Sequence, residues 1–168
     1  MENSAVLSIQ NERQKIVILD LIALAIVYLV PTVSHLFSVP LYLAEPLRVF
    51  VILSLIHTKK ENAFILALTL PLFSFLISGH PILLKMLIII FELGLNVLLF
   101  IVLTKKLNNV FLSMLLSIAL SKMFFYGVQY MFISVTWIDP AMVEHPLIPQ
   151  IVVTVLMSGY GYLMLRKN

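Results

Sequence analysis

Six polar side chains interrupt two long apolar stretches of the sequence: Lys85, Glu92, Asn96, Lys122, Tyr126 and Gln129. The first three are separated by seven and four residues, and the last three by four and three residues. Both spacings place their three side chains on one face of an α-helix. Ionisable groups are costly in hydrocarbon, so their presence in apolar helices indicates a functional interior. Such groups could orient a charged ligand or transfer protons.

The two stretches that carry these side chains are residues 82–104 and 110–135, each long enough to cross a bilayer. Glu92 and Lys122 each lie 13 residues from the nearer end of the polar turn 105–109. At 1.5 Å per residue, both lie about 20 Å from the turn. Opposite charges at one depth on antiparallel helices predict an ion pair or a shared ligand site.

The composition indicates an all-α membrane protein with a single domain spanning residues 1–168. Only 11% of the 168 residues are charged and 61% are hydrophobic, whereas soluble domains carry about a quarter charged residues. The absence of cysteine excludes disulfides and thiolate chemistry. No Walker, HExxH or GxSxG motif is present, so the chain cannot hydrolyse ATP itself. Nothing in the sequence favours a cofactor, a metal ion or nucleic acid.

The apolar runs predict six transmembrane helices, at about residues 16–34, 45–57, 63–78, 82–104, 110–135 and 150–165. We expect Pro71 to interrupt the third helix. The apolar run 49–56 of the second helix is too short to span, so Arg48 is expected to lie at membrane depth. It is 11 residues, or about 16 Å, from Lys59 and could reach the level of Glu92.

The basic residues predict the orientation of these helices. Of 11 Lys and Arg residues, eight fall at the N-terminus, in alternate loops and at the C-terminus: Arg13, Lys15, Lys59, Lys60, Lys105, Lys106, Arg166 and Lys167. The opposite three loops hold none. The positive-inside rule then places both termini in the cytoplasm, with the chain crossing the cytoplasmic membrane several times.

Two further patterns have mainly structural interpretations. The histidines His35, His80 and His145 lie in predicted outer loops near Asp139 and Glu144, but their spacing matches no metal signature, which favours a loop surface. Serines recur every fourth residue at 113, 117 and 121, and alanines at 63 and 67. Small residues at this spacing allow membrane helices to approach closely.

The chain resembles the substrate-binding S components of energy-coupling factor transporters. The resemblance lies in six helices, a proline-containing first outer loop, and polar residues on the fourth and fifth helices. Residues 31–35 (PTVSH) followed by 45–48 (EPLR) look like that family's first loop running into its second helix. The family's Ala-x-x-x-Ala patch is replaced here by Ala23 and Ala25, at a shorter spacing.

The resemblance implies a subunit that captures a vitamin-like micronutrient near the outer face. Uptake would require a transmembrane coupling subunit and ATPase subunits. The implied site contains the six polar residues above together with Arg48. Arg48, Lys85 and Lys122 against Glu92 suggest a cationic site for an anionic ligand, a carboxylate or a phosphate.

Two alternatives are compatible with the same residues. The chain could be an intramembrane enzyme that uses Glu92, Lys122 and a loop histidine for acid–base chemistry. It could instead be a scaffold whose charges only hold helices together. An enzyme converts its substrate unaided, a capture subunit binds a ligand unchanged, and a scaffold does neither.

Overall fold

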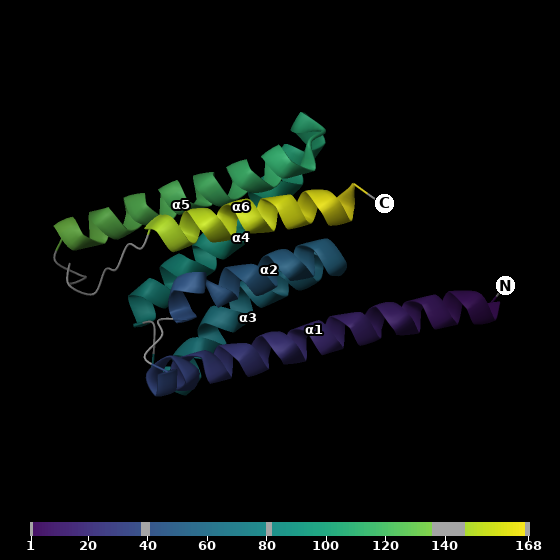
Figure 1. Ribbon diagram of the computed structural model, residues 1–168, viewed down its shortest axis with the longest axis horizontal. Helices are drawn as coiled ribbons and strands as arrows, with labels where there is room; N and C mark the ends of the chain where they lie inside the picture. The colour runs from purple at the N-terminus through teal and green to yellow at the C-terminus, as the bar shows by residue number, and fades with distance from the viewer. Residues whose placement is uncertain (1, 38–40, 80–81, 136–146, 167–168) are drawn as a thin grey trace.

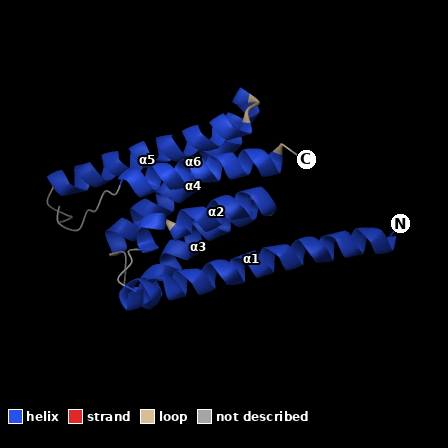
Figure 2. Cartoon of the chain, in the orientation of Figure 1, coloured by secondary structure: helices blue, strands red, loops and turns tan. Residues whose placement is uncertain are grey.

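The computed structural model describes residues 2–37, 41–79, 82–135 and 147–166, and these residues form helices and short connections without a β-strand (Figures 1 and 2). The elements are α1 (Glu2–Phe37), the 3₁₀ helix η1 (Leu41–Ala44), α2 (Pro46–His57), α3 (Lys60–Ser78), α4 (Leu83–Leu107), α5 (Val110–Ser134) and α6 (Leu147–Leu165). The predicted all-α class is confirmed for this part of the chain.

The helices run alternately up and down in one bundle (Figure 1). The start of α1 and the end of α6 lie at the same end of the bundle, together with the α2–α3 and α4–α5 connections. We call this the basic end, because Lys59 and Lys60 lie at the first connection and Lys105 and Lys106 in the last turn of α4. At the opposite end, η1 leads into α2.

Local signals in the sequence explain the sharp turn between α4 and α5. Asn108 adopts the left-handed conformation (φ 48°) that asparagine tolerates better than most residues. Asn109 caps α5, its side-chain oxygen accepting a hydrogen bond of 3.1 Å from the backbone N–H of Leu112. The connection is therefore two residues long, and the five-residue turn predicted at 105–109 was too long.

The predicted boundary of the first helix was wrong at both ends. α1 begins at Glu2 instead of residue 16 and continues through Pro31 and His35 to Phe37. Its first residues are rich in Glu, Gln, Arg and Lys, which are good helix formers, and no glycine or proline interrupts them. A polar segment that precedes an apolar run can therefore remain helical. Part of α1 extends beyond the rest of the basic end (Figure 1).

The other boundaries differ less. α3 begins three residues early and continues through Pro71 as one helix, so the predicted interruption does not end it. α6 begins at Leu147, three residues before its predicted start. The predicted loop residues His80, Asp139, Glu144 and His145 lie outside the described residues.

Four of the described helices, α3, α4, α5 and α6, are long and apolar enough to cross a membrane, and α2 is a shorter apolar helix. The buried core joins α2, α3, α4 and α5 through completely buried side chains such as Ile52, Leu70, Val97 and Ile118. Many large apolar side chains instead point outward, including Leu76, Phe91 and Ile151. Apolar surface outside a packed core is what a multi-pass membrane protein presents to lipid.

Candidate functional site

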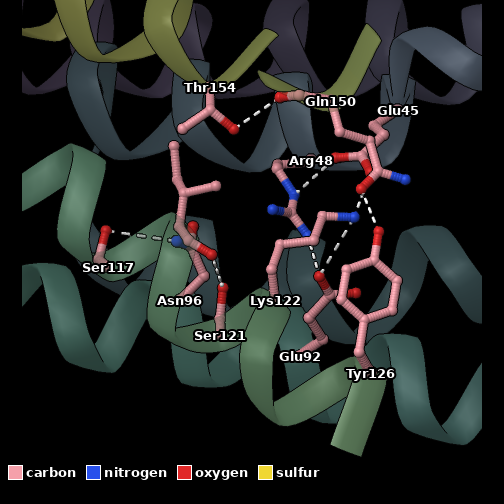
Figure 3. A network of polar contacts seen from close by, with 11 residues as sticks. Glu45, Arg48, Glu92, Asn96, Ser117, Ser121, Lys122, Tyr126, Gln150 and Thr154 are labelled. Carbon is pink, nitrogen blue, oxygen red and sulfur yellow. Dashed lines mark hydrogen bonds and ion pairs between the residues drawn. The ribbon is translucent and has the colours of Figure 1, made fainter. Parts of the chain in front are cut away.

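Four ionised side chains from three helices and one connection meet inside the bundle (Figure 3). Arg48, in the first turn of α2, donates a hydrogen bond from Nη2 to Oε1 of Glu92 on α4. Lys122 on α5 donates to Oε1 of Glu45, and its Nζ lies 3.6 Å from Oε1 of Glu92. The Arg48 Nε lies 3.1 Å from Oε2 of Glu45. We call Glu45, Arg48, Glu92 and Lys122 the charge quartet.

The quartet lies closer to the end opposite the basic residues. Glu92 is 15 residues before the end of α4 and nine after its start. These spacings correspond to about 22 Å from the basic end and about 14 Å from the other. Two antiparallel helices thus bring Glu92 and Lys122 to one depth, which confirms the predicted proximity of the pair. The prediction that Arg48 reaches this level is also confirmed.

Each charge in the quartet is surrounded by protein. The side chains of Arg48 and Glu92 are 3% and 4% exposed, while those of Lys122 and Glu45 are 13% and 15% exposed. Burying unpaired charges would cost several kcal/mol per ion, whereas two cations alternating with two anions compensate one another. Glu45 and Lys122 form the more accessible side of the quartet.

Glu45 is the member that the sequence interpretation missed. Counting Arg48, Lys85 and Lys122 against Glu92 gave a cationic site, but Glu45 adds a second carboxylate that balances Arg48 and Lys122. The sequence does carry a signal for it, because Glu45 and Arg48 are three residues apart at the start of α2.

The backbone of Glu45 is also unusual. Glu45 is the N-cap of α2 and adopts the left-handed conformation (φ 49°, ψ 56°), which is uncommon for a residue with a side chain. Its carboxylate makes no capping bond to α2 and reaches the two cations instead. Pro46 follows at the first helical position, where it is favourable because its missing N–H would be unsatisfied in any case.

The hydrogen-bonding capacity of Arg48 is not fully used. Its Nη1 is buried and has no hydrogen-bond partner among the described residues. Its Nε and the Glu45 Oε2 are close in space without forming a hydrogen bond of good geometry. A guanidinium has five donors in a planar fork. The quartet therefore retains donors that an additional acceptor group could engage.

Aromatic and amide groups extend the site toward α6. The Lys122 Nζ lies 5.5 Å from the ring centroid of Phe125 and 5.7 Å from that of Tyr126. Tyr126 donates from its hydroxyl to Oε1 of Gln150, a residue of α6 that sequence reasoning did not select. Tyr126 thus lies between Lys122 of the quartet and α6.

The remaining predicted residues occupy different places. Asn96, completely buried and one turn from Glu92 toward the basic end, donates a hydrogen bond of 3.3 Å to Ser117. Gln129 is buried on α5, and its Oε1 has no hydrogen-bond partner among the described residues. Lys85 is partly buried in the first turn of α4, two turns from Glu92 toward the end opposite the basic end. The charge quartet, as defined above, does not include these three residues.

A second polar group lies nearer the basic end and joins three helices. The Asn62 amide nitrogen of α3 lies 2.9 Å from Oδ1 of Asp20 on α1 and 3.0 Å from Oγ of Ser54 on α2. The Ser54 hydroxyl also lies 2.8 Å from that of Thr58. The polar atoms of this group form hydrogen bonds with one another, so we assign the group to helix packing.

The predicted serine row is buried on α5, and Ser117 in its middle contacts Asn96 of α4. Ser113, Ser117 and Ser121 are completely buried, and Ala63 and Ala67 are equally buried in the core around α3. We expect Ser117→Leu to lower stability by about 1–3 kcal/mol, because extra volume forces a packed helix pair apart. Ser134→Leu, the same change at an exposed position of α5, is the control. Unfolding in detergent measures the difference; equal stability of the two variants would contradict this packing.

Comparison with family models, curated proteins and solved structures finds no match. The functional interpretation therefore depends on the residues themselves.

Proposed function

We propose that this chain is the substrate-capture subunit of an ATP-driven importer, and that it binds a small anionic, vitamin-like ligand near the outer face of the cytoplasmic membrane. The observation that carries the proposal is the charge quartet, buried between α2, α4 and α5 with donors of Arg48 unused. Charged groups inside membrane proteins are costly and concentrate at working sites. A purely structural ion pair between two helices would not need four charges and a strained connection.

The proposed topology has six spans and cytoplasmic termini. The apolar run 16–34 in α1 is long enough for a hydrocarbon core, and α2 would cross together with the η1 connection. The arrangement of the bundle supports this orientation, since the described basic residues outside the membrane segments belong to elements that meet at one end. The Lys59 Nζ lies 3.3 Å from Oε2 of Glu12, four residues before the apolar run of α1 begins, and this contact supports a cytoplasmic start for that run.

Single cysteines test this topology, because the chain has none of its own. We expect an impermeant maleimide to label Val135→Cys in intact cells and to label Lys60→Cys and Lys106→Cys only after permeabilisation. All three positions are exposed in the structure. Labelling of Lys106→Cys in intact cells, with Val135→Cys protected, would reverse the orientation and contradict the proposal.

The proposed division of labour follows from the same sequence. No nucleotide-binding motif is present, so in the proposed importer a transmembrane coupling subunit and ATPase subunits supply the energy for uptake against a gradient. The chain in proteoliposomes should bind the metabolite that copurifies with it, release it unchanged, and accumulate none. Concentrative uptake driven by a proton or sodium gradient alone would show a self-sufficient transporter. Chemical conversion of the metabolite would show an enzyme.

A further inference from the structure

We propose that Glu45 occupies the place of the ligand's carboxylate, and that a carboxylate ligand binds by exchanging with it on Arg48 and Lys122. This inference rests on the proposed capture function and specifies the ligand class and the binding step. Glu45 contacts both cations of the quartet, with one oxygen at each: Oε1 at Lys122 and Oε2 at Arg48. An incoming carboxylate has the same two oxygens and the same charge.

The two carboxylates of the quartet are not equivalent. Glu92 is in the middle of α4, is nearly completely buried and receives a hydrogen bond from Arg48. Glu45 is more exposed and belongs to the short connection between η1 and α2. The Glu92 carboxylate is enclosed by protein in the middle of a packed helix, whereas that of Glu45 lies on the more exposed side of the quartet, where its side chain has room to rotate away. Glu45 is therefore the exchangeable anion and Glu92 the fixed one.

The backbone and side-chain geometry of Glu45 also indicates that its contacts with the two cations can be replaced. Its left-handed backbone conformation is unfavourable for residues other than glycine and asparagine. Its Oε2 and the Nε of Arg48 lie 3.1 Å apart without a well-formed hydrogen bond, and Nη1 of Arg48 has no partner among the described residues. A free carboxylate can approach a guanidinium in the plane of its fork and form two parallel bonds, which Glu45 does not achieve.

Charge balance selects a carboxylate over a phosphate. Exchange of one singly charged anion for another keeps the quartet neutral at two positive and two negative charges. A phosphate monoester carries about −1.5 to −2 charges at neutral pH and would leave excess negative charge beside buried Glu92. The exchange would also affect the connection between η1 and α2, because the displaced Glu45 directly follows Ala44, the last residue of η1.

Chemical rescue of Glu45→Gly tests this exchange. Glycine tolerates the left-handed backbone and removes the carboxylate, leaving a vacated site between Arg48 and Lys122. Sodium acetate should raise the thermal midpoint of this variant by about 2–4 °C relative to sodium chloride at equal ionic strength. Neutral acetamide should not raise it. Glu45→Gln, which fills the same space without charge, should show no acetate effect, and neither should Glu45→Gly combined with Lys122→Met.

A second measurement keeps the inference testable if Glu45→Gly does not fold. Ala44→Cys, at an exposed position, reports on the connection in an otherwise unchanged chain. Acetate should increase its maleimide labelling rate severalfold, while that of Val135→Cys stays constant. Equal effects of acetate, chloride and acetamide in both experiments would overturn the exchange. The Glu45 carboxylate would then be a permanent ion-pair partner of Arg48 and Lys122. The absence of any metabolite retained by the wild-type protein is a different result, which counts against the proposed function instead.

Discussion

Replacing Arg48 with methionine should destabilise the protein by about 3–5 kcal/mol, the largest effect of any single substitution considered. Methionine is an unbranched apolar side chain that fills much of the same space, but it lacks the cation that contacts both Glu92 and Glu45. Two buried carboxylates would then share Lys122, and breaking a buried ion pair by removing one partner typically has this cost. Detergent-mediated unfolding monitored by circular dichroism measures it.

Matched variants separate the charge effect from general damage. Arg166→Met makes the same change at an exposed position after α6 and should be nearly neutral. Adding Glu92→Met to Arg48→Met should recover much of the lost stability, because the remaining Glu45 and Lys122 form a balanced pair. Destabilisation by Arg48→Met that equals that of Arg166→Met, or that simply adds to the effect of Glu92→Met, would contradict the quartet as a coupled unit.

The second large effect concerns ligand affinity. Lys122→Met should weaken binding of the copurifying metabolite about 10- to 150-fold, which corresponds to about 1.5–3 kcal/mol for a hydrogen bond to a charged group. Lys122 is the more accessible cation of the quartet, and its Nζ also lies near the rings of Phe125 and Tyr126. Isothermal titration calorimetry measures the loss.

The control for this variant is Lys105→Met, which removes an exposed lysine in the last turn of α4, near the basic end. Its affinity should equal that of the wild type. If Lys105→Met and Lys122→Met bind the metabolite equally well, the ligand does not contact the quartet. The substitution at Lys122 must also leave the protein folded in circular dichroism for the comparison to apply.

The sequence was sufficient to predict the order of the helices and the meeting of three charged residues, Arg48, Glu92 and Lys122. Helical rise alone placed Glu92 and Lys122 at one level, and the 11-residue distance from Lys59 placed Arg48 at the level of Glu92. These predictions succeed because membrane helices are straight, regular and antiparallel when joined by short turns. Length and apolarity then determine most of the geometry.

The residues that were missed lie where this regularity ends. Glu45 belongs to a connection, and its approach to Lys122 requires a left-handed backbone that helical periodicity does not encode. Gln150 meets Tyr126 across two helices separated by the segment 136–146. The extent of α1 was underestimated because an apolar run marks the hydrocarbon region, whereas helix formation continues through good helix-forming polar residues. Contacts between elements distant in sequence require the fold.

Native mass spectrometry of the protein released from detergent micelles tests the central claim most directly. We expect the wild-type chain and Lys105→Met each to carry one small molecule whose accurate mass and fragmentation identify a carboxylic acid. Lys122→Met, folded to the same extent, should be recovered without it. A wild-type protein that carries no small molecule under conditions that preserve bound lipid, or a ligand retained equally by Lys122→Met, would contradict capture of a carboxylate at the quartet.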